Sequence, residues 1–185
     1  MIDTILAEAE SKMTKSVDAY VRELANIRTG RANPALIEKV MVPYYGTPTP
    51  LNQLASISAP EARLLLVQPY DRSQIAAMEK ALRTSDAAVN PASDGAVIRV
   101  PIPPLTEERR REYVRVARHK GEEARIAVRN VRRDEAHRIN EAERSGEVSE
   151  DLAKRAMERL QKITDEHVGT IDGLAARKEA EVMEV

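Results

Sequence analysis

The chain has 185 residues, a formal net charge of −1, and charged side chains at 32% of its positions, above the roughly 25% of an average soluble protein. It lacks cysteine, which excludes disulfides, a thiol nucleophile and a Cys-ligated zinc site; this fits a reducing compartment, and we expect a cytoplasmic protein. Phenylalanine and tryptophan are absent, which removes the usual base-stacking platforms of RNA-recognition motifs and many single-strand-binding barrels, and no apolar run approaches the roughly 18 residues of a membrane span.

The first predicted element is an amphipathic helix at the start of the chain. All ten prolines lie between Pro34 and Pro104, and the flanks on either side are dense in Ala, Glu and Arg, which favours helices there. We expect the first helix to end at Thr29–Gly30, since glycine commonly terminates helices. Its apolar stripe, spaced by three or four residues, comprises Ile2, Leu6, Ala9, Met13, Val17, Tyr20, Leu24 and Ile27.

The central, proline-containing block predicts short strands and one short helix. Branched aliphatic residues favour strands at 36–42 and 64–67, and a third at 98–100 that the following prolines confine to a sheet edge or a strand end. Residues 44–48 predict a turn. Between the strands, Asp71 can cap a helix, whose apolar residues would be Ile75, Met78, Ala81 and Leu82.

Two further helices follow the last proline. Thr106 is a good N-cap, and the helix that it opens extends to about Ser145–Gly146, some 40 residues. Ser149 then caps a third helix, with acidic residues in its first turn. The apolar side of the third helix would comprise Leu152, Ala156, Leu160, Ile163, Ile171 and Leu174.

These elements predict an α+β protein of two domains. Three amphipathic helices joined by short turns cannot each bury a stripe alone, so we predict a long three-helix bundle from residues 1–30 and 106–185. Residues 31–105 form an inserted small β/α/β domain. The chain crosses twice between the domains, and the hinge is predicted at Arg31, Ala32, Asn33, Pro103, Pro104, Leu105 and Thr106.

The second helix of the predicted bundle concentrates basic charge on one side. Residues 109–133 hold ten bases, nine of them arginine, against three acids. On a helical wheel with Ala117 at zero, the stripe of Tyr113, Gly121, Ala124, Val128, Val131 and Ala142 faces the core, and acids cluster near −120°. The arginine face, between about 60° and 160° and about 33 Å long, comprises Arg111, Arg115, Arg118, Arg125, Arg129, Arg132 and Arg133.

Two interpretations of the arginine face compete. Charge runs on helices are commonly solvated surfaces with i,i+4 ion pairs. Here the acids of the same helix lie on its opposite side and only Glu122 interrupts the arginines, so we expect poor pairing. Guanidinium groups also bind phosphates bidentately, whereas lysine would serve a merely soluble surface equally well. The pattern therefore favours a polyanion, namely structured RNA or DNA recognised by its backbone.

No enzyme is indicated. His119, His137 and His167 lack metal-ligand spacing, so we expect no metal site, and the pair His137 and Glu141 is more simply a pair of surface residues. Phosphate-binding loops, dinucleotide fingerprints and nucleophile elbows are absent from the sequence. We expect neither catalytic residues nor a cofactor.

Four strings, in this order, resemble the ribosome recycling factor family. They are IRTGRA at 27–32, YYGTPTPL at 44–51, RVPIPPLTEERR at 99–110 and AVRNVRRD at 127–134. The resemblance extends from the first helix to the end of the chain. The sequence departs from the family's pattern at Glu135, where a small residue is common.

The resemblance implies a fold, a function and partners. The fold would be a three-helix bundle, domain I, with an inserted β/α/β domain II, together L-shaped and similar in outline to a transfer RNA. The function would be binding to the post-termination ribosome and, with elongation factor G and GTP hydrolysis, separation of its subunits. Domain I would lie on ribosomal RNA of the large subunit near the central intersubunit bridge. We expect a monomer without a membrane partner.

By position, the family's RNA-contacting arginines fall on Arg129, Arg132 and Arg133, with Arg28 and Arg31 near the hinge end of the bundle. The arginine face adds Arg118 and Arg125 to this candidate RNA-binding set. Several alternatives stay open. Arg28 and Arg31 could cap carbonyls at the end of the first helix, the stem of Arg132 could pack against the core, and Tyr44 and Tyr45 are better explained by packing in domain II than by contact with a partner.

Two other functional classes compete with a recycling factor. A helical scaffold would use its charges on protein partners, with an affinity for ribosomes or RNA that hardly depends on salt, whereas phosphate binding weakens steeply as salt rises. A general RNA chaperone would bind free RNA without preferring ribosomes. The near-zero net charge and the absence of a basic tail argue against the chaperone.

Overall fold

A computed structural model describes residues 1–184, which form two compact units. Unit 1 comprises Met1–Ile27 and the chain from Arg110 onward, and unit 2 comprises Arg28–Arg109. The chain therefore changes unit at 27/28 and 109/110, whereas the sequence places the crossings at 30/31 and 105/106. Within the described residues, none of the helices combines the length and the apolar character needed to cross a membrane.

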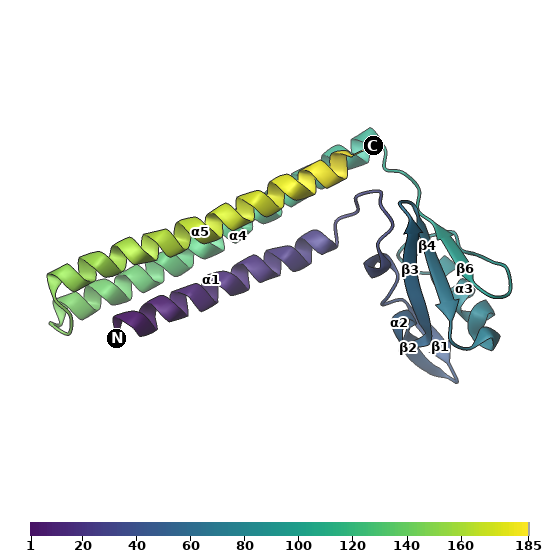
Figure 1. The fold of residues 1–185 in the computed structure, drawn as a ribbon, viewed down its shortest axis with the longest axis horizontal. Coiled ribbons are helices and arrows are strands. Elements are labelled where there is room, and N and C mark those ends of the chain that lie inside the picture. Colours follow the sequence, from purple (N-terminus) through teal and green to yellow (C-terminus); the bar gives the residue numbers. More distant parts are fainter. Residues whose placement is uncertain (185) are drawn as a thin grey trace. The chain divides into compact units, whose positions relative to one another are not determined.

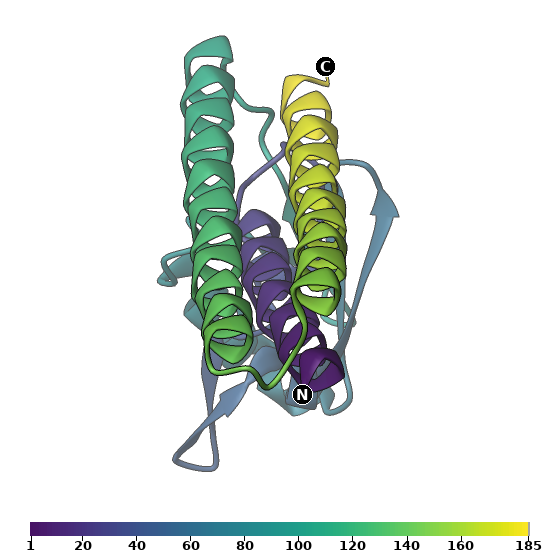
Figure 2. The same ribbon diagram turned by 90° about the vertical axis from the view of Figure 1, so that its left-hand side faces the viewer.

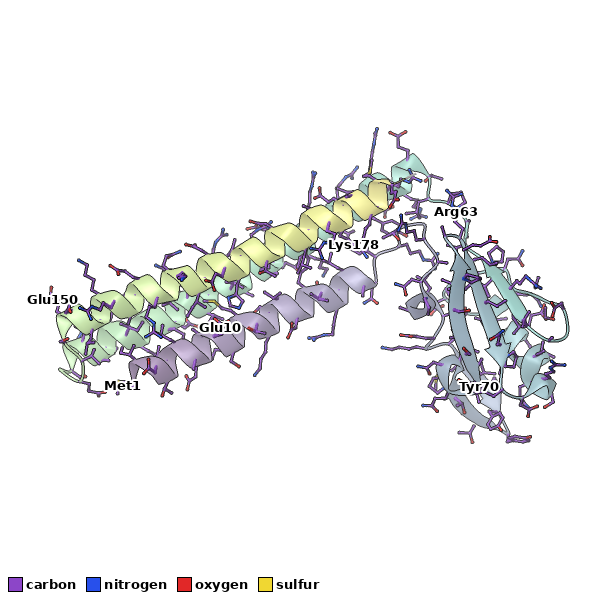
Figure 3. All side chains as sticks on the ribbon, viewed as in Figure 1. Met1, Glu10, Arg63, Tyr70, Glu150 and Lys178 are labelled. Atoms are coloured by element: carbon purple, nitrogen blue, oxygen red, sulfur yellow. The ribbon has the colours of Figure 1, made fainter. Side chains whose placement is uncertain are left out.

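Unit 1 is a bundle of three long helices, as predicted: α1 (Ile2–Ala25), α4 (Glu107–Arg144) and α5 (Glu150–Met183). Figures 1 and 2 show α4 running antiparallel to both other helices. Met1 and Glu150 accordingly lie at one end of the bundle and Lys178 lies toward the other (Figure 3). The backbones of α1 and α5 approach each other most closely.

The ends of the three helices follow from local chemistry. The Thr106 hydroxyl accepts a hydrogen bond from the Arg109 amide at 3.2 Å, and the Ser149 hydroxyl accepts one from the Leu152 amide at 3.2 Å, so both predicted N-caps are confirmed. Between α4 and α5 the chain turns at Gly146, whose φ of +79° is readily adopted by glycine. The first helix ends at Ala25, four residues before the predicted stop at Thr29.

The bundle core contains most residues of the predicted stripes, with departures in α4 and α5. Leu152 is 50% exposed, and the buried position in that turn of α5 is Ala153. Glu135 is completely buried, although the sequence placed only apolar or small residues in the α4 stripe. The buried core residues of unit 1 include Leu6, Met13, Tyr20, Ala117, Val128, Ile139, Leu160 and Ile171.

Unit 2 contains an antiparallel sheet of four strands in the order β3 (Ala55–Glu61), β4 (Leu64–Pro69), β6 (Ile98–Pro101) and β5 (Ala92–Ser93). A separate hairpin consists of β1 (Met41–Tyr44) and β2 (Thr47–Pro50). The helical segments are η1 (Pro34–Leu36), α2 (Leu51–Leu54), η2 (Arg72–Gln74) and α3 (Ile75–Arg83). The buried core of this unit includes Ile37, Val42, Leu51, Leu65, Val67, Met78, Leu82, Ile98 and Val100.

Several predictions for unit 2 need correction. The predicted strand at 36–42 begins as the 3-10 helix η1, because Asn33 accepts a hydrogen bond from the Ala35 amide at 3.0 Å and caps a turn there. The strand β6 lies inside the sheet, between β4 and β5, and Pro101 is its last residue, so of the two predicted placements the strand end is confirmed and the sheet edge is wrong. Asp71 does cap the segment η2 that leads into α3, by accepting from the Ser73 amide at 3.0 Å.

Candidate nucleic-acid interface

The arginine face of α4 borders α5, and α5 supplies partners that a single-helix wheel does not contain. Arg118 donates from Nε and Nη2 to the two carboxylate oxygens of Glu179, at 2.6 and 3.2 Å. These hydrogen bonds, and then the charge of Glu179, raise the pKa of Arg118. The sequence-based expectation that this face is poorly paired is therefore wrong at Arg118.

Arg125 is the most heavily paired arginine of the face. It donates from Nη1 to Asp172 on α5 at 2.7 Å and from Nε to Glu122 on its own helix at 3.0 Å, and its side chain is only 20% exposed. Burial works against its charged form, and the hydrogen bonds to both carboxylates outweigh burial and raise its pKa. Arg118 and Arg125 thus link α4 to α5, and the carboxylates that they bind offset most of their charge.

The arginines near the far end of the face keep more of their charge. Arg129 is 57% exposed, and its nearest carboxylate oxygen, on Glu122, lies 3.9 Å away. Arg133 is 72% exposed, and its ion-pair partner among residues 1–184 is the neighbouring Asp134, at 3.4 Å. Exposed pairs of this geometry are worth little, because water screens them. Both guanidinium groups can therefore exchange these partners for a phosphate at small cost.

Arg132 lies between these two residues and is half-buried. Its Nε donates to Oε1 of Gln161 on α5 at 2.7 Å. The expectation that its stem packs near the core agrees with this position. Sequence reasoning did not identify Gln161, because only the contact between the two helices reveals it.

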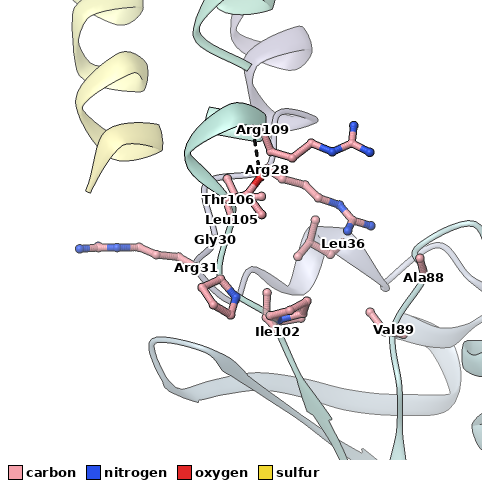
Figure 4. Close-up of a pocket in the computed structure, with 12 residues that line it drawn as sticks. Arg28, Gly30, Arg31, Leu36, Ala88, Val89, Ile102, Leu105, Thr106 and Arg109 are labelled. Atoms are coloured by element: carbon pink, nitrogen blue, oxygen red, sulfur yellow. Dashed lines mark hydrogen bonds between the residues drawn. The ribbon is translucent and has the colours of Figure 1, made fainter. Parts of the chain in front are cut away.

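Arg28 and Arg31 belong to unit 2 and lie after the end of α1. Arg28 donates from Nη2 to the carbonyl of Ala87, so the alternative in which it caps α1 is wrong. Arg31 is exposed, and its backbone amide donates to the Thr29 hydroxyl at 3.4 Å. Arg28 and Arg31 extend to opposite sides of the crossing segments (Figure 4).

Five of the seven predicted hinge residues line a hollow of about 130 Å³ within unit 2 (Figure 4), namely Arg31, Pro103, Pro104, Leu105 and Thr106. The two crossing segments pass close to each other there, because Gly30, with a φ of +79°, leaves a Cβ position only 3.6 Å from the Leu105 amide nitrogen. Ala32 is fixed to the sheet by a 2.7 Å hydrogen bond to Ala62, and Ile102 by one of 2.8 Å to Arg63. These two backbone hydrogen bonds anchor the crossing segments to the turn between β3 and β4 at Ala32 and Ile102.

The tyrosine pair at the β1–β2 hairpin departs from the packing expected of it. Tyr44 is half-buried and lines a hollow with Tyr70, but Tyr45 is 79% exposed at the tip. Tyr45 also has a φ of +47°, which is uncommon for a non-glycine residue. The packing interpretation therefore holds for Tyr44 and is wrong for Tyr45.

The described residues contain no group of three or more His, Asp or Glu side chains placed to hold a metal ion. His167 is instead used in packing: its Nδ1 lies 2.7 Å from the Ile163 carbonyl and its Nε2 lies 3.3 Å from the Thr14 hydroxyl of α1. His137 is exposed.

Comparison with known proteins gives a consistent result. A sequence model of the ribosome recycling factor family matches residues 20–183. The ribosome-recycling factor of Geobacillus kaustophilus is 53% identical over 185 residues, and that of Saccharopolyspora erythraea is 55% identical over 185 residues; each match covers all of both chains.

Two solved structures are also similar to the chain. One is a solution structure of a ribosome recycling factor, with 47% sequence identity and a TM-score of 0.77, covering 100% of this chain and 98% of the other. The second is a T. thermophilus ribosome recycling factor placed with E. coli elongation factor G on the E. coli post-termination complex. It has 44% identity and a TM-score of 0.67, and the match covers all of both chains.

Proposed function

Since the chain belongs to the ribosome recycling factor family, we propose that it binds the post-termination ribosome and, with elongation factor G and GTP hydrolysis, separates the subunits so that mRNA and deacylated tRNA are released. The family consists of translation factors rather than enzymes. A relative 44% identical over its whole length is placed with elongation factor G on such a complex, which supports both partners for this chain.

The RNA-binding surface proposed for this function is the part of the arginine face around Arg129, Arg132 and Arg133. The observation that carries it is the difference in compensation along α4. Arg118 and Arg125 are engaged by carboxylates of α5, whereas the three later arginines keep donors for phosphate oxygens. Arg118 and Arg125 would contribute mainly to the bundle, and Arg28 and Arg31 would contact RNA from the segment after α1.

The proposed hinge follows from the tethering of the two crossing segments. Ala32 and Ile102 are bonded to the turn between β3 and β4, so bending is expected at 26–31 and 103–105 and less at Ala32 and Asn33. In this proposal, elongation factor G acts on unit 2, and the paired crossings transmit the displacement to the bundle.

The first experiment compares the wild type with Arg132→Ala. Binding to the large ribosomal subunit is measured over a range of salt, and subunit release is measured by sucrose-gradient sedimentation with a matched elongation factor G and GTP. We expect Arg132→Ala to weaken binding about tenfold, to lower the slope of log affinity against log salt by about one, and to reduce release. Arg83→Ala is the control, because Arg83 is an exposed arginine of unit 2 that pairs only with Glu79 among the described residues.

Each result has a defined meaning. Release that is unaffected by Arg132→Ala would preserve the recycling function and move the critical contacts elsewhere. No release by the wild type would contradict the function itself. Affinity for the ribosome that hardly varies with salt would favour the scaffold, and equal affinity for free RNA would favour the chaperone.

A further inference from the structure

Three arginines of α4 each form a side-chain hydrogen bond to a residue of α5. The α4 partners are arginines seven residues apart, a spacing that returns to nearly the same side of a helix after about two turns. The α5 partners are eleven and seven residues apart, which likewise places them on one stripe. The contacts are Arg118 with Glu179, Arg125 with Asp172, and Arg132 with Gln161.

The third contact differs from the other two in charge. Glu179 and Asp172 are carboxylates, and each offsets the charge of the arginine that it binds. Gln161 is a neutral amide, and its Oε1 accepts the hydrogen bond from Arg132 Nε at 2.7 Å. Arg132 is therefore held by α5 without losing its charge.

The amide of Gln161 is itself oriented by a second contact. Its Nε2 donates to Oδ1 of Asp165, one turn further along α5, at 2.8 Å. Because the amide NH₂ faces a carboxylate, the amide oxygen must face Arg132. Asp165 is exposed, and within residues 1–184 it forms no ion pair with Arg132, whose side chain is bonded to the amide of Gln161 instead.

The donors of Arg132 that remain are suited to a phosphate. Within residues 1–184, the side chain's one hydrogen bond is from Nε, which leaves both Nη groups to act as a fork. Holding Nε restricts the rotamers of a long side chain before binding, so less conformational entropy is lost when a phosphate is bound.

We propose that Gln161 is a positioning residue for RNA recognition: it fixes the Arg132 guanidinium on the face of the bundle while leaving its positive charge available to a phosphate of ribosomal RNA. This inference rests on the proposed function and deepens it. A carboxylate at position 161 would hold Arg132 at least as firmly but would compete with the phosphate. The amide therefore fixes the position of the guanidinium without neutralising its charge, whereas the carboxylates in the other two contacts do both.

The critical variant is Gln161→Glu, which has nearly the same shape and converts the third contact into an ion pair like the other two. We expect its melting temperature to stay near that of the wild type, because the new ion pair with Arg132 offsets the lost hydrogen bond to Asp165 and the repulsion between the two carboxylates. Its affinity for the large ribosomal subunit should fall about tenfold, as for Arg132→Ala, and the salt slope should fall by about one. A variant that keeps its stability and binds less well cannot be explained by damage to the fold.

A second variant, Gln161→Met, removes the acceptor and keeps most of the volume. Arg132 then keeps its charge but loses its fixed orientation. We expect affinity to fall only about threefold, with the salt slope unchanged, because the same number of phosphates is still neutralised. The two variants thus separate the charge effect from the positional effect.

Gln68→Glu is the matched control. It makes the same change, from glutamine to glutamate, at an exposed residue of β4 in unit 2, which contains none of the arginine face. We expect its affinity to stay within about twofold of the wild type, because Arg132 keeps its hydrogen bond to Gln161.

The double variant Gln161→Glu with Arg132→Ala tests whether Gln161 acts through Arg132. In the Arg132→Ala background, Gln161→Glu should change affinity no more than the Gln68→Glu control does. A further large loss would mean that position 161 acts on RNA in another way, and would overturn the proposal.

The outcomes also distinguish this inference from the proposed function. If Arg132→Ala weakens binding and Gln161→Glu binds like the wild type, the role of Gln161 is overturned while the interface is retained. If Arg132→Ala itself binds like the wild type, the proposed interface is wrong and the role of Gln161 fails with it.

Discussion

At the scale of single residues, Glu135 shows how unit 1 accommodates a carboxylate in its core. Its Oε1 lies 2.7 Å from Lys12 Nζ and its Oε2 lies 2.8 Å from Arg138 Nη1, while its own side chain is 1% exposed. Arg138 also pairs with Glu8, which lowers the pKa of Glu8 through a hydrogen bond and then through its charge. Both cations reach solvent, with side chains 51% and 43% exposed, so only the carboxylate bears a large desolvation cost.

This geometry predicts that two substitutions at position 135 differ in their effect on the free energy of unfolding. Glu135→Gln places an NH₂ group against Arg138 and leaves a buried donor without an acceptor, so it should destabilise the protein by about 1–3 kcal/mol. Glu135→Leu removes the buried polar group, and both cations can turn to water, so it should stay within about 1 kcal/mol of the wild type. Urea unfolding followed by helical circular dichroism measures both values. A leucine variant that is less stable than the glutamine variant would mean that the ion pairs contribute net stability.

A helical wheel of the sequence predicts that position 135 is buried, but the sequence does not show why a carboxylate is tolerated there. Glu135 follows Ala117 by eighteen residues, five turns of an ideal helix, so the wheel places it in the centre of the core stripe. What makes a carboxylate acceptable there is a lysine 123 positions away in the chain. The same limit explains Gln161, whose importance depends on the register between α4 and α5.

At the scale of elements, local signals predicted those parts of the fold that local chemistry determines. The periodic apolar stripes and the caps at Thr106 and Ser149 predicted α4 and α5 closely, because both are set by residues within a few turns. The strands β2 and β3 were missed. They have the sequences TPTP and ASISAPE, which lack branched aliphatic runs, and they form because partners from other segments complete their hydrogen bonds.

The packing of α1 against α4 depends on a tyrosine that enters the space above a glycine. The Tyr20 hydroxyl donates to the Ala117 carbonyl at 3.0 Å, and the ring is 1% exposed. A Cβ on Gly121 would lie 3.0 Å from that hydroxyl. The glycine therefore serves helix–helix contact, although glycine in a helix interior costs about 0.5–1 kcal/mol relative to alanine.

We accordingly predict that Gly121→Ala does not stabilise the protein, although alanine usually stabilises a helix interior relative to glycine. It should leave stability unchanged or lower it, because Tyr20 is buried and its hydroxyl is fixed. Gly173→Ala in α5, where a Cβ meets nothing within 4 Å, should instead raise stability by about 0.5–1 kcal/mol. In a Tyr20→Phe background the hydroxyl is gone, and Gly121→Ala should become more favourable than in the wild type. Equal effects of Gly121→Ala in both backgrounds would contradict this account.

At the scale of the whole molecule, the two units have separate hydrophobic cores. The proposed RNA-binding arginines of α4 lie in unit 1, and the proposed target of elongation factor G lies in unit 2. A change confined to the core of unit 2 should therefore spare ribosome binding and impair subunit release, whereas a change in the core of unit 1 should impair binding and the release that depends on it. The paired crossings, at 27/28 and 109/110, tie the units together by two chain segments.

The final prediction uses one core leucine from each unit, both completely buried. Leu65→Ala should destabilise unit 2 by about 2–5 kcal/mol, and Leu160→Ala should destabilise unit 1 by a similar amount. Amide hydrogen exchange measures the loss of protection in each unit separately. Leu65→Ala should retain affinity for the large ribosomal subunit and lose subunit release, because the bundle still presents its arginines but unit 2 yields when elongation factor G acts on it. Leu160→Ala should weaken both steps. Equal loss of affinity in the two variants would show that binding and release do not divide between the units.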